Sequence, residues 1–143
     1  MNRNLLVCSS ALVLLVIACG SGTRPVVKGD KFNPIFPADR DDYSVVVATE
    51  KKGFALANLK KGDQEVATFA ITDLVTDPEA IEKFKASTEQ IAGYPMIPRG
   101  DSGTAVLVGN RFQVQVRSKS DAFTASERKD WLLRFRFDDL AGF

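Results

Sequence analysis

The stretch Thr104–Arg117, TAVLVGNRFQVQVR, decides the fold predicted for this chain. Two runs rich in β-branched residues flank Gly109-Asn110, a dipeptide that tolerates the positive φ angles of a tight hairpin turn. In the second run apolar residues alternate with glutamines: Phe112, Val114 and Val116 against Gln113 and Gln115. Because successive side chains of a strand point to opposite faces, one face of this strand is apolar and the other is polar and exposed to solvent. The sequence therefore predicts an antiparallel sheet that is covered on one side.

Three further strands are predicted upstream of this hairpin, over Tyr43–Thr49, Phe54–Leu59 and Glu65–Leu74. The first is dense in valine, and in the third Ala67, Phe69 and Ile71 lie on one face with Thr68 and Thr72 on the other. Short turns with glycine and lysine separate them, at residues 50–53 and 60–63. The spacing of these turns favours neighbouring antiparallel strands.

Two helices are predicted to follow the two groups of strands. The first begins at Asp77-Pro78-Glu79, where the aspartate can cap free amides and proline suits the first turn. Apolar residues then continue at helical spacing to Ile91, and Gly93 with Pro95 ends the helix. The second begins at the capping box Thr124–Glu127, and its buried stripe is formed by Trp131, Leu132 and Phe135.

The predicted fold class is α+β: an antiparallel sheet of about five strands with two helices on one face, in the order βββα-ββα. Residues 43–143 would form this single domain. Residues 19–42, rich in glycine, proline and aspartate, read as a flexible tether. Three apolar residues within the tether could instead dock on the domain or on a partner: Phe32, Ile35 and Phe36.

The first residues form a short leader. Arg3 precedes an apolar run from Leu5 to Ile17, which ends in Val16-Ile17-Ala18-Cys19-Gly20. This stretch resembles the lipobox of bacterial lipoproteins. The resemblance implies a signal peptide over residues 1–18, cleavage between Ala18 and Cys19, and diacylation of the Cys19 thiol. The alternatives are an ordinary secretory signal and a membrane-spanning helix, although a spanning helix needs about 20 apolar residues.

Composition restricts the chemistry that the chain can perform. The two cysteines are Cys8, in the leader, and Cys19, at the predicted cleavage site, and the sequence contains no histidine. Zinc sites with histidine or thiolate ligands are therefore excluded, and no cofactor is expected besides the covalent lipid. Arg3 is the only charged residue before Cys19, so the rest of the chain carries equal numbers of each sign. Bulk charge would thus hold neither nucleic acid nor an anionic lipid surface.

Two short motifs overlap before the hairpin. Gly100-Asp101-Ser102-Gly103 resembles the nucleophile segment of trypsin-like serine proteases, but that mechanism needs a histidine. A tight turn that leads into a strand is the favoured interpretation. A hydrolase would have to use Ser102 with a lysine, or carboxylates such as Asp101 and Asp73. Arg99-Gly100-Asp101 matches the integrin-binding tripeptide, a match too short to carry an argument.

Two further clusters of charged residues, one acidic and one basic, are most simply interpreted as solvated surface residues. The aspartates at 39, 41 and 42 lack the ligand spacing of a calcium loop, so a solvated acidic patch is favoured. The lysine pairs Lys51-Lys52 and Lys60-Lys61 could bind an acidic partner if their two turns share one end of the sheet. Otherwise they are solubilising turn residues.

The segment Tyr94–Pro98 is the candidate partner-binding loop, with Tyr94, Met96, Ile97 and Arg99 as its contact residues. Tyrosine, methionine and arginine are enriched in interfaces, whereas packing against the sheet is the equal alternative. The sequence thus predicts a non-enzymatic, lipid-anchored envelope lipoprotein that binds another envelope protein. An inhibitor or immunity-type lipoprotein, inserting Tyr94–Asp101 into an envelope hydrolase, is the alternative. In a Gram-negative host, Gly20 after Cys19 resembles outer-membrane-sorted lipoproteins, and the domain would face the periplasm.

Overall fold

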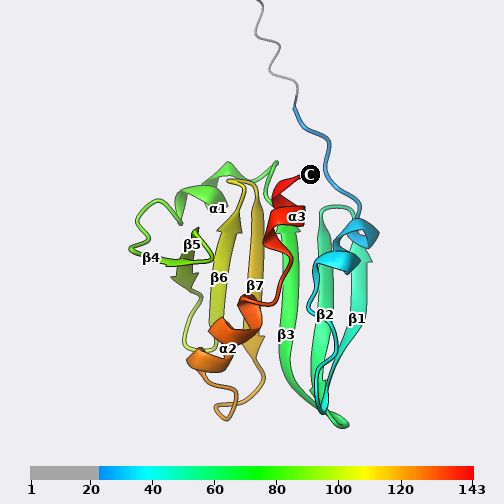
Figure 1. Cartoon of the computed structure of the whole chain (residues 1–143). Helices are drawn as coiled ribbons and strands as arrows, with labels where there is room; N and C mark the ends of the chain where they lie inside the picture. The colour runs from blue at the N-terminus through cyan, green and yellow to red at the C-terminus, as the bar shows by residue number, and fades with distance from the viewer. Residues whose placement is uncertain (1–22) are drawn as a thin grey trace, which may run out of the picture.

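A computed structural model describes residues 23–143, and the predicted cleavage and lipidation residues Ala18 and Cys19 lie outside this range (Figure 1). The chain forms a seven-stranded antiparallel sheet in the spatial order β1-β2-β3-β7-β6-β5-β4. The strands are β1 (Tyr43–Lys51), β2 (Phe54–Lys61), β3 (Gln64–Asp73), β4 (Glu89–Ile91), β5 (Tyr94–Pro98), β6 (Gly103–Val108) and β7 (Phe112–Ser118). The helices are short: η1 (Gly29–Ile35, a 3-10 helix), α1 (Pro78–Glu82), α2 (Ala125–Leu132) and α3 (Phe137–Ala141).

The hairpin that decided the predicted fold is confirmed. Strands β6 and β7 pair from Val108 with Phe112 to Gly103 with Arg117. The loop is one residue longer than predicted, because Gly109, Asn110 and Arg111 all lie between the paired residues Val108 and Phe112. Its first two residues have the expected positive φ, 59° at Gly109 and 52° at Asn110. The three upstream strands are also confirmed, and β3 pairs with β7 so that the two groups form one sheet.

The main core lies on one face of this sheet. Alternate residues of β2, β3, β6 and β7 are fully buried there, among them Leu59, Phe69 and Val116. Helices α2 and α3 and the 3-10 helix η1 cover this face (Figure 1). The aromatic residues concentrate under them: the ring of Phe69 lies 5.6 Å from Trp131 and 5.3 Å from Phe135, centre to centre. The capping box predicted at Thr124 and Glu127 opens α2 and is present.

The predicted helix over Asp77–Ile91 is wrong in its second half. Helix α1 ends at Glu82, residues 89–91 form β4, and Tyr94–Pro98 forms β5 rather than an irregular loop. The sheet therefore has seven strands instead of about five.

The two predicted helices also lie on opposite faces. Phe84, which follows α1, packs with Ala105 and Leu107 of β6, whereas the alternating residues Val106 and Val108 belong to the core under α2. The α+β prediction is thus met only in its coarse form, a sheet with a few short helices.

The predicted tether is wrong over its second half. Phe32, Ile35 and Phe36 are buried in the main core, and the Phe32 ring lies 5.9 Å from that of Phe112. Burying three such side chains stabilises the ordered state by an amount that offsets the loss of chain entropy. Residues 29–36 are therefore part of the domain, as the docking alternative anticipated.

Candidate functional site

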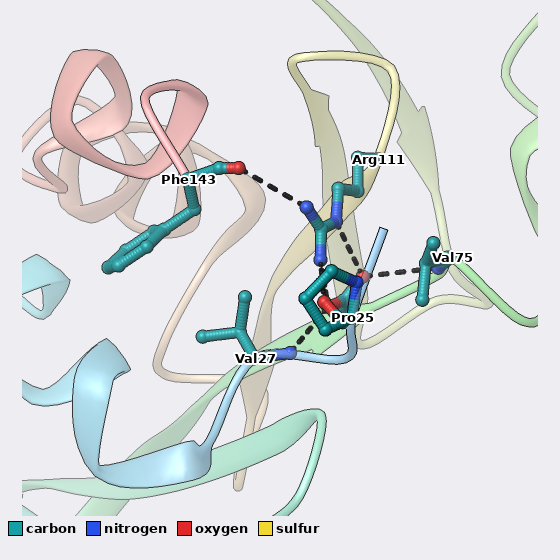
Figure 2. A network of polar contacts seen from close by, with 6 residues as sticks. Pro25, Val27, Val75, Arg111 and Phe143 are labelled. Atoms are coloured by element: carbon teal, nitrogen blue, oxygen red, sulfur yellow. Dashed lines mark hydrogen bonds and ion pairs between the residues drawn. The ribbon is translucent and has the colours of Figure 1, made fainter. Parts of the chain in front are cut away.

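The most elaborate polar contact in the described chain joins Asp73, at the end of β3, to Arg111, just before β7 (Figure 2). Both side chains are buried. Arg111 donates from Nε to Asp73 Oδ1 at 2.9 Å and from Nη2 to Asp73 Oδ2 at 2.7 Å. This two-pronged geometry satisfies both charges in a place where an unpaired ion would be costly.

The same pair holds the N-terminal segment against the sheet. Arg111 Nη2 also donates to the carbonyl oxygen of Pro25 at 2.8 Å, and Asp73 Oδ2 accepts from the amide of Val27 at 3.0 Å. The Val27 carbonyl in turn accepts from the amide of Gly53 at 2.7 Å. On the other side, Arg111 Nη1 donates to the Phe143 carbonyl oxygen at 3.2 Å, as Figure 2 shows. We call these contacts the Asp73–Arg111 clamp.

Electrostatics keep the clamp ionised at neutral pH. Burial acts to raise the pKa of Asp73, but hydrogen bonds from Arg111 and from the amides of Val27 and Val75, together with the Arg111 charge, outweigh it. The pKa of Asp73 therefore lies below its ordinary value of 3.8. Every oxygen of this carboxylate is used for structure, so we assign the clamp a positional role.

The clamp holds Pro25 and Val27 at the ends of β3 and β7. Pro25 stands six positions after Cys19 in the sequence. Sequence reasoning named Asp73 only as a candidate catalytic carboxylate and missed Arg111. A signal was available, because Asp73 continues the alternation of Ala67, Phe69 and Ile71 on the buried face of β3. A carboxylate at such a position needs a buried cation.

A second feature is the face of the sheet opposite the main core. On β1, β2 and β3 the described elements leave this face without a helix, since α1 packs over β5 and β6. Cross-strand rows of uncharged, partly exposed residues form its centre: Val46, Asn58 and Thr68, and then Leu56 and Ala70. We call these residues the uncovered face. Charged residues border this centre, because Thr68 pairs with Arg117 of β7 and Asn58 donates to the Glu65 carboxylate at 3.0 Å.

The candidate partner-binding loop is not a loop. Within β5, Met96 is buried in the main core and Ile97 packs against the cluster under α1. Tyr94 is half-buried, with its ring 5.6 Å from that of Phe137 and its hydroxyl donating to Asp138 at 3.4 Å. Burial is the main cause that raises the pKa of Tyr94, and the neighbouring Asp138 carboxylate raises it further. The prediction of an exposed loop is wrong. The inhibitor hypothesis needed Tyr94–Asp101 to insert into a target enzyme, and Tyr94–Pro98 is instead a strand of the sheet.

Arg99 is the remaining member of that predicted set, and it lies in the turn between β5 and β6. Its amide donates to the Gly103 carbonyl at 2.9 Å. The structure therefore brings Tyr94, Met96 and Ile97 into packing roles and leaves Arg99 in a tight turn, as the Gly-Asp-Ser-Gly interpretation anticipated.

The carboxylates of the hydrolase hypothesis lie far apart. Asp73 pairs with Phe112 at one end of β7, whereas Gly103, which follows Asp101 and Ser102, pairs with Arg117 near the other end. Five strand residues separate these positions by about 17 Å, beyond the ~9.5 Å upper limit for a glycosidase carboxylate pair. Ser102 accepts a hydrogen bond from Arg117 at 2.9 Å, an interaction that does not activate a nucleophile.

Ser102 also borders a polar depression of about 480 Å³ beside the start of α2. Its most buried charged member is Arg128, whose guanidinium donates to the Thr104 hydroxyl, to the Ser118 hydroxyl and to the Asp101 carbonyl. These three hydrogen bonds join separate elements of the fold, so the burial of this guanidinium has a structural explanation.

The two lysine pairs lie at opposite ends of β2, because Lys51-Lys52 opens the turn into β2 and Lys60-Lys61 closes the strand. They cannot form one surface. The acidic residues near the start of β1 make ordinary contacts: Asp39 accepts from the Val45 amide at 2.8 Å, and Asp41 pairs with Arg40. Within residues 23–143 no group of acidic or other ligand side chains is arranged to hold a metal.

Comparison with family models, with curated proteins and with solved structures finds no match for this chain. None of the helices within residues 23–143 has the length and hydrophobicity of a membrane-spanning segment. The clamp, the uncovered face and the leader sequence are the features of the chain that bear on its function.

Proposed function

We propose that this chain is a lipid-anchored cell-envelope lipoprotein that acts as a non-enzymatic binding or accessory module for another envelope protein. The lipid would be attached at Cys19, after removal of residues 1–18. The observation that carries the proposal is the Asp73–Arg111 clamp, because it holds Pro25 only six positions after the cysteine. A cysteine whose thiol carries the anchor would keep such a domain close to its membrane.

The uncovered face is the proposed partner surface. It replaces the Tyr94–Pro98 segment, whose side chains pack inside the domain. An uncharged, partly exposed sheet face resembles the centre of an interface, from which charged residues are depleted. Val46 adds an aliphatic side chain that is 45% exposed at one edge of this face.

Crosslinking in intact cells tests the proposal. Native protein and a Cys19→Ala form would be crosslinked, captured and compared. We expect one envelope protein to be enriched only with the native, membrane-attached form. The absence of any enriched protein, with both forms folded, would contradict the binding role.

A matched pair of variants tests the surface. Thr68→Lys places a charge at the centre of the uncovered face, whereas Thr88→Lys makes the same change at an exposed position after α1. We expect capture to be lost only with Thr68→Lys. Equal capture by both folded variants would move the partner surface elsewhere.

A further inference from the structure

Three lysines gather at the end of the sheet formed by the β1–β2 turn. Lys51 and Lys52 form the turn between β1 and β2, and Lys28 lies beside them before η1. These three lysines line one shallow depression with Asp30 and Glu50. Among residues 23–143, no carboxylate lies within ion-pair distance of Lys28, Lys51 or Lys52.

Close backbone contacts fix the positions of the three lysines. The Gly53 amide donates to Val27, which places the Lys51-Lys52 turn against the N-terminal segment. A Cβ at Gly29 would lie 2.5 Å from the Lys51 carbonyl oxygen, so the two backbones are in direct contact. The side-chain amide of Asn33 donates a hydrogen bond to the Glu50 carboxylate. We call Lys28, Lys51 and Lys52 the basic corner.

The opposite end of the same hairpin is different. There Lys61 lies 3.9 Å from the Asp42 carboxylate, and Lys119 lies 3.9 Å from that of Glu65. Two lysines at that end are thus held in ion pairs, whereas the three lysines of the basic corner are not. Local concentration of charge therefore supplies what the net charge does not.

The basic corner is also the part of the domain nearest to the proposed anchor. Six residues from Cys19 to Pro25 span at most about 21 Å when fully extended. In Figure 1 the N-terminal segment leaves the domain at the end where the β1–β2 turn and the C-terminus lie. A membrane that held Cys19 would therefore face this end of the sheet.

We propose that the basic corner docks on anionic phospholipid headgroups of the membrane that holds the anchor, an inference that depends on the proposed lipidation of Cys19. Each lysine near such a surface strengthens binding roughly fivefold. Docking through this end of the strands would align them roughly along the membrane normal and would present the uncovered face sideways. The acidic residues Glu79 and Glu82 of α1 lie over β5 and β6, so the β1–β2 side tilts toward the lipid.

Amine labelling of the lipidated, full-length mature protein tests the docking. The protein is purified from cells and reconstituted in vesicles of phosphatidylcholine alone or mixed with phosphatidylglycerol. The modification rate of each lysine is then measured by mass spectrometry. We expect Lys51 and Lys52 to react several-fold more slowly in the anionic vesicles, whereas Lys60 and Lys61, at the other end of β2, react equally in both.

A pair of variants with the same charge change completes the test. In anionic vesicles, Lys51→Gln/Lys52→Gln should lower the docking equilibrium about 25-fold, and Lys28 should lose its protection. Lys60→Gln/Lys61→Gln should leave Lys28 protected. A diacylated protein whose Lys51 and Lys52 react equally in both vesicle types would overturn the docking alone. The absence of diacylglycerol from Cys19 would overturn the anchor and the docking with it.

Discussion

Replacing Asp73 with asparagine removes one charge from the clamp and changes the side-chain shape very little. Each carboxylate oxygen accepts two hydrogen bonds: Oδ1 from Arg111 Nε and the Val75 amide, and Oδ2 from Arg111 Nη2 and the Val27 amide. Whichever oxygen becomes an amide nitrogen, two donors then face a donor. Arg111 also keeps a buried charge without its partner.

The expected loss of unfolding free energy is about 3–5 kcal/mol, the usual cost of breaking a buried ion pair by removing one member. This is a large fraction of the ~5–15 kcal/mol that stabilises a typical domain. Urea titration gives the value, because Trp131 is the single tryptophan and is buried. Asp63→Asn, in the exposed turn between β2 and β3, is the matched control and should change stability by less than about 0.5 kcal/mol.

A fall of less than about 1 kcal/mol for Asp73→Asn would refute the reasoning, since surface ion pairs already contribute that much. Replacing the whole pair with apolar residues, as in Asp73→Leu/Arg111→Met, should recover much of the loss. Trypsin adds a local readout. In Asp73→Asn, the bond after Lys28 should be cut faster, because the weakened clamp holds Pro25 and Val27 less firmly against the sheet.

The clamp also predicts the direction of a pH dependence. The pKa of Asp73 is lower in the folded state than its ordinary value of 3.8, so the folded state favours the carboxylate. Its contribution is therefore fully present above pH 3.8 and is lost as the pH falls through the folded pKa. Urea titrations in this acidic range should show a steeper loss of stability for the native protein than for Asp73→Asn. Parallel curves would contradict the assignment.

Three further substitutions test the packing. Gly29→Ala should prevent normal docking of η1, because its Cβ would lie 2.5 Å from the carbonyl oxygens of Lys51 and Phe54; a thermal midpoint equal to that of the native protein would contradict this. Met96→Ala should lower the unfolding free energy by about 2–5 kcal/mol in urea titration, because the side chain is buried, whereas a free partner surface would leave stability unchanged. Thr124→Ala should cost about 1 kcal/mol by removing the cap of α2, and no change in thermal midpoint would show that the cap is dispensable.

The sequence was informative where local patterns and burial agree. The alternation of glutamines and apolar residues in β7, and the Gly109-Asn110 turn, specify the hairpin without tertiary information. The capping box of α2 is equally local, because Thr124 and Glu127 satisfy each other's amides.

The predicted helix over Asp77–Ile91 shows why other segments could not be read. Ile81 and Phe84 pack on one face of the sheet, and Ile91 packs on the other. Their helical spacing was therefore a coincidence between two separate cores. Ala92 and Gly93, with φ of 51° and 82°, form a hairpin turn where the sequence suggested a helix end.

The clamp could not be predicted because its members are distant in the sequence. Asp73 and Arg111 are 38 positions apart, and the Pro25 carbonyl is 86 positions from Arg111. Only the pairing of β3 with β7 brings these groups together. Strand alternation places Asp73 on the buried face of β3, which indicates that a cation must pair with it. The alternation does not indicate which arginine or lysine supplies that cation.

The position of the clamp within the sheet determines how mechanical load would reach the domain. Strands β3 and β7 lie in the middle of the sheet order, with β2 and β1 on one side and β6, β5 and β4 on the other. Tension on the N-terminal segment would enter at Asp73 and Arg111, at the ends of these two central strands, and not at an edge. A force applied there is distributed to the neighbouring strands on both sides, β2 and β6. A partner that applies force to the tethered domain would therefore not readily detach a single edge strand.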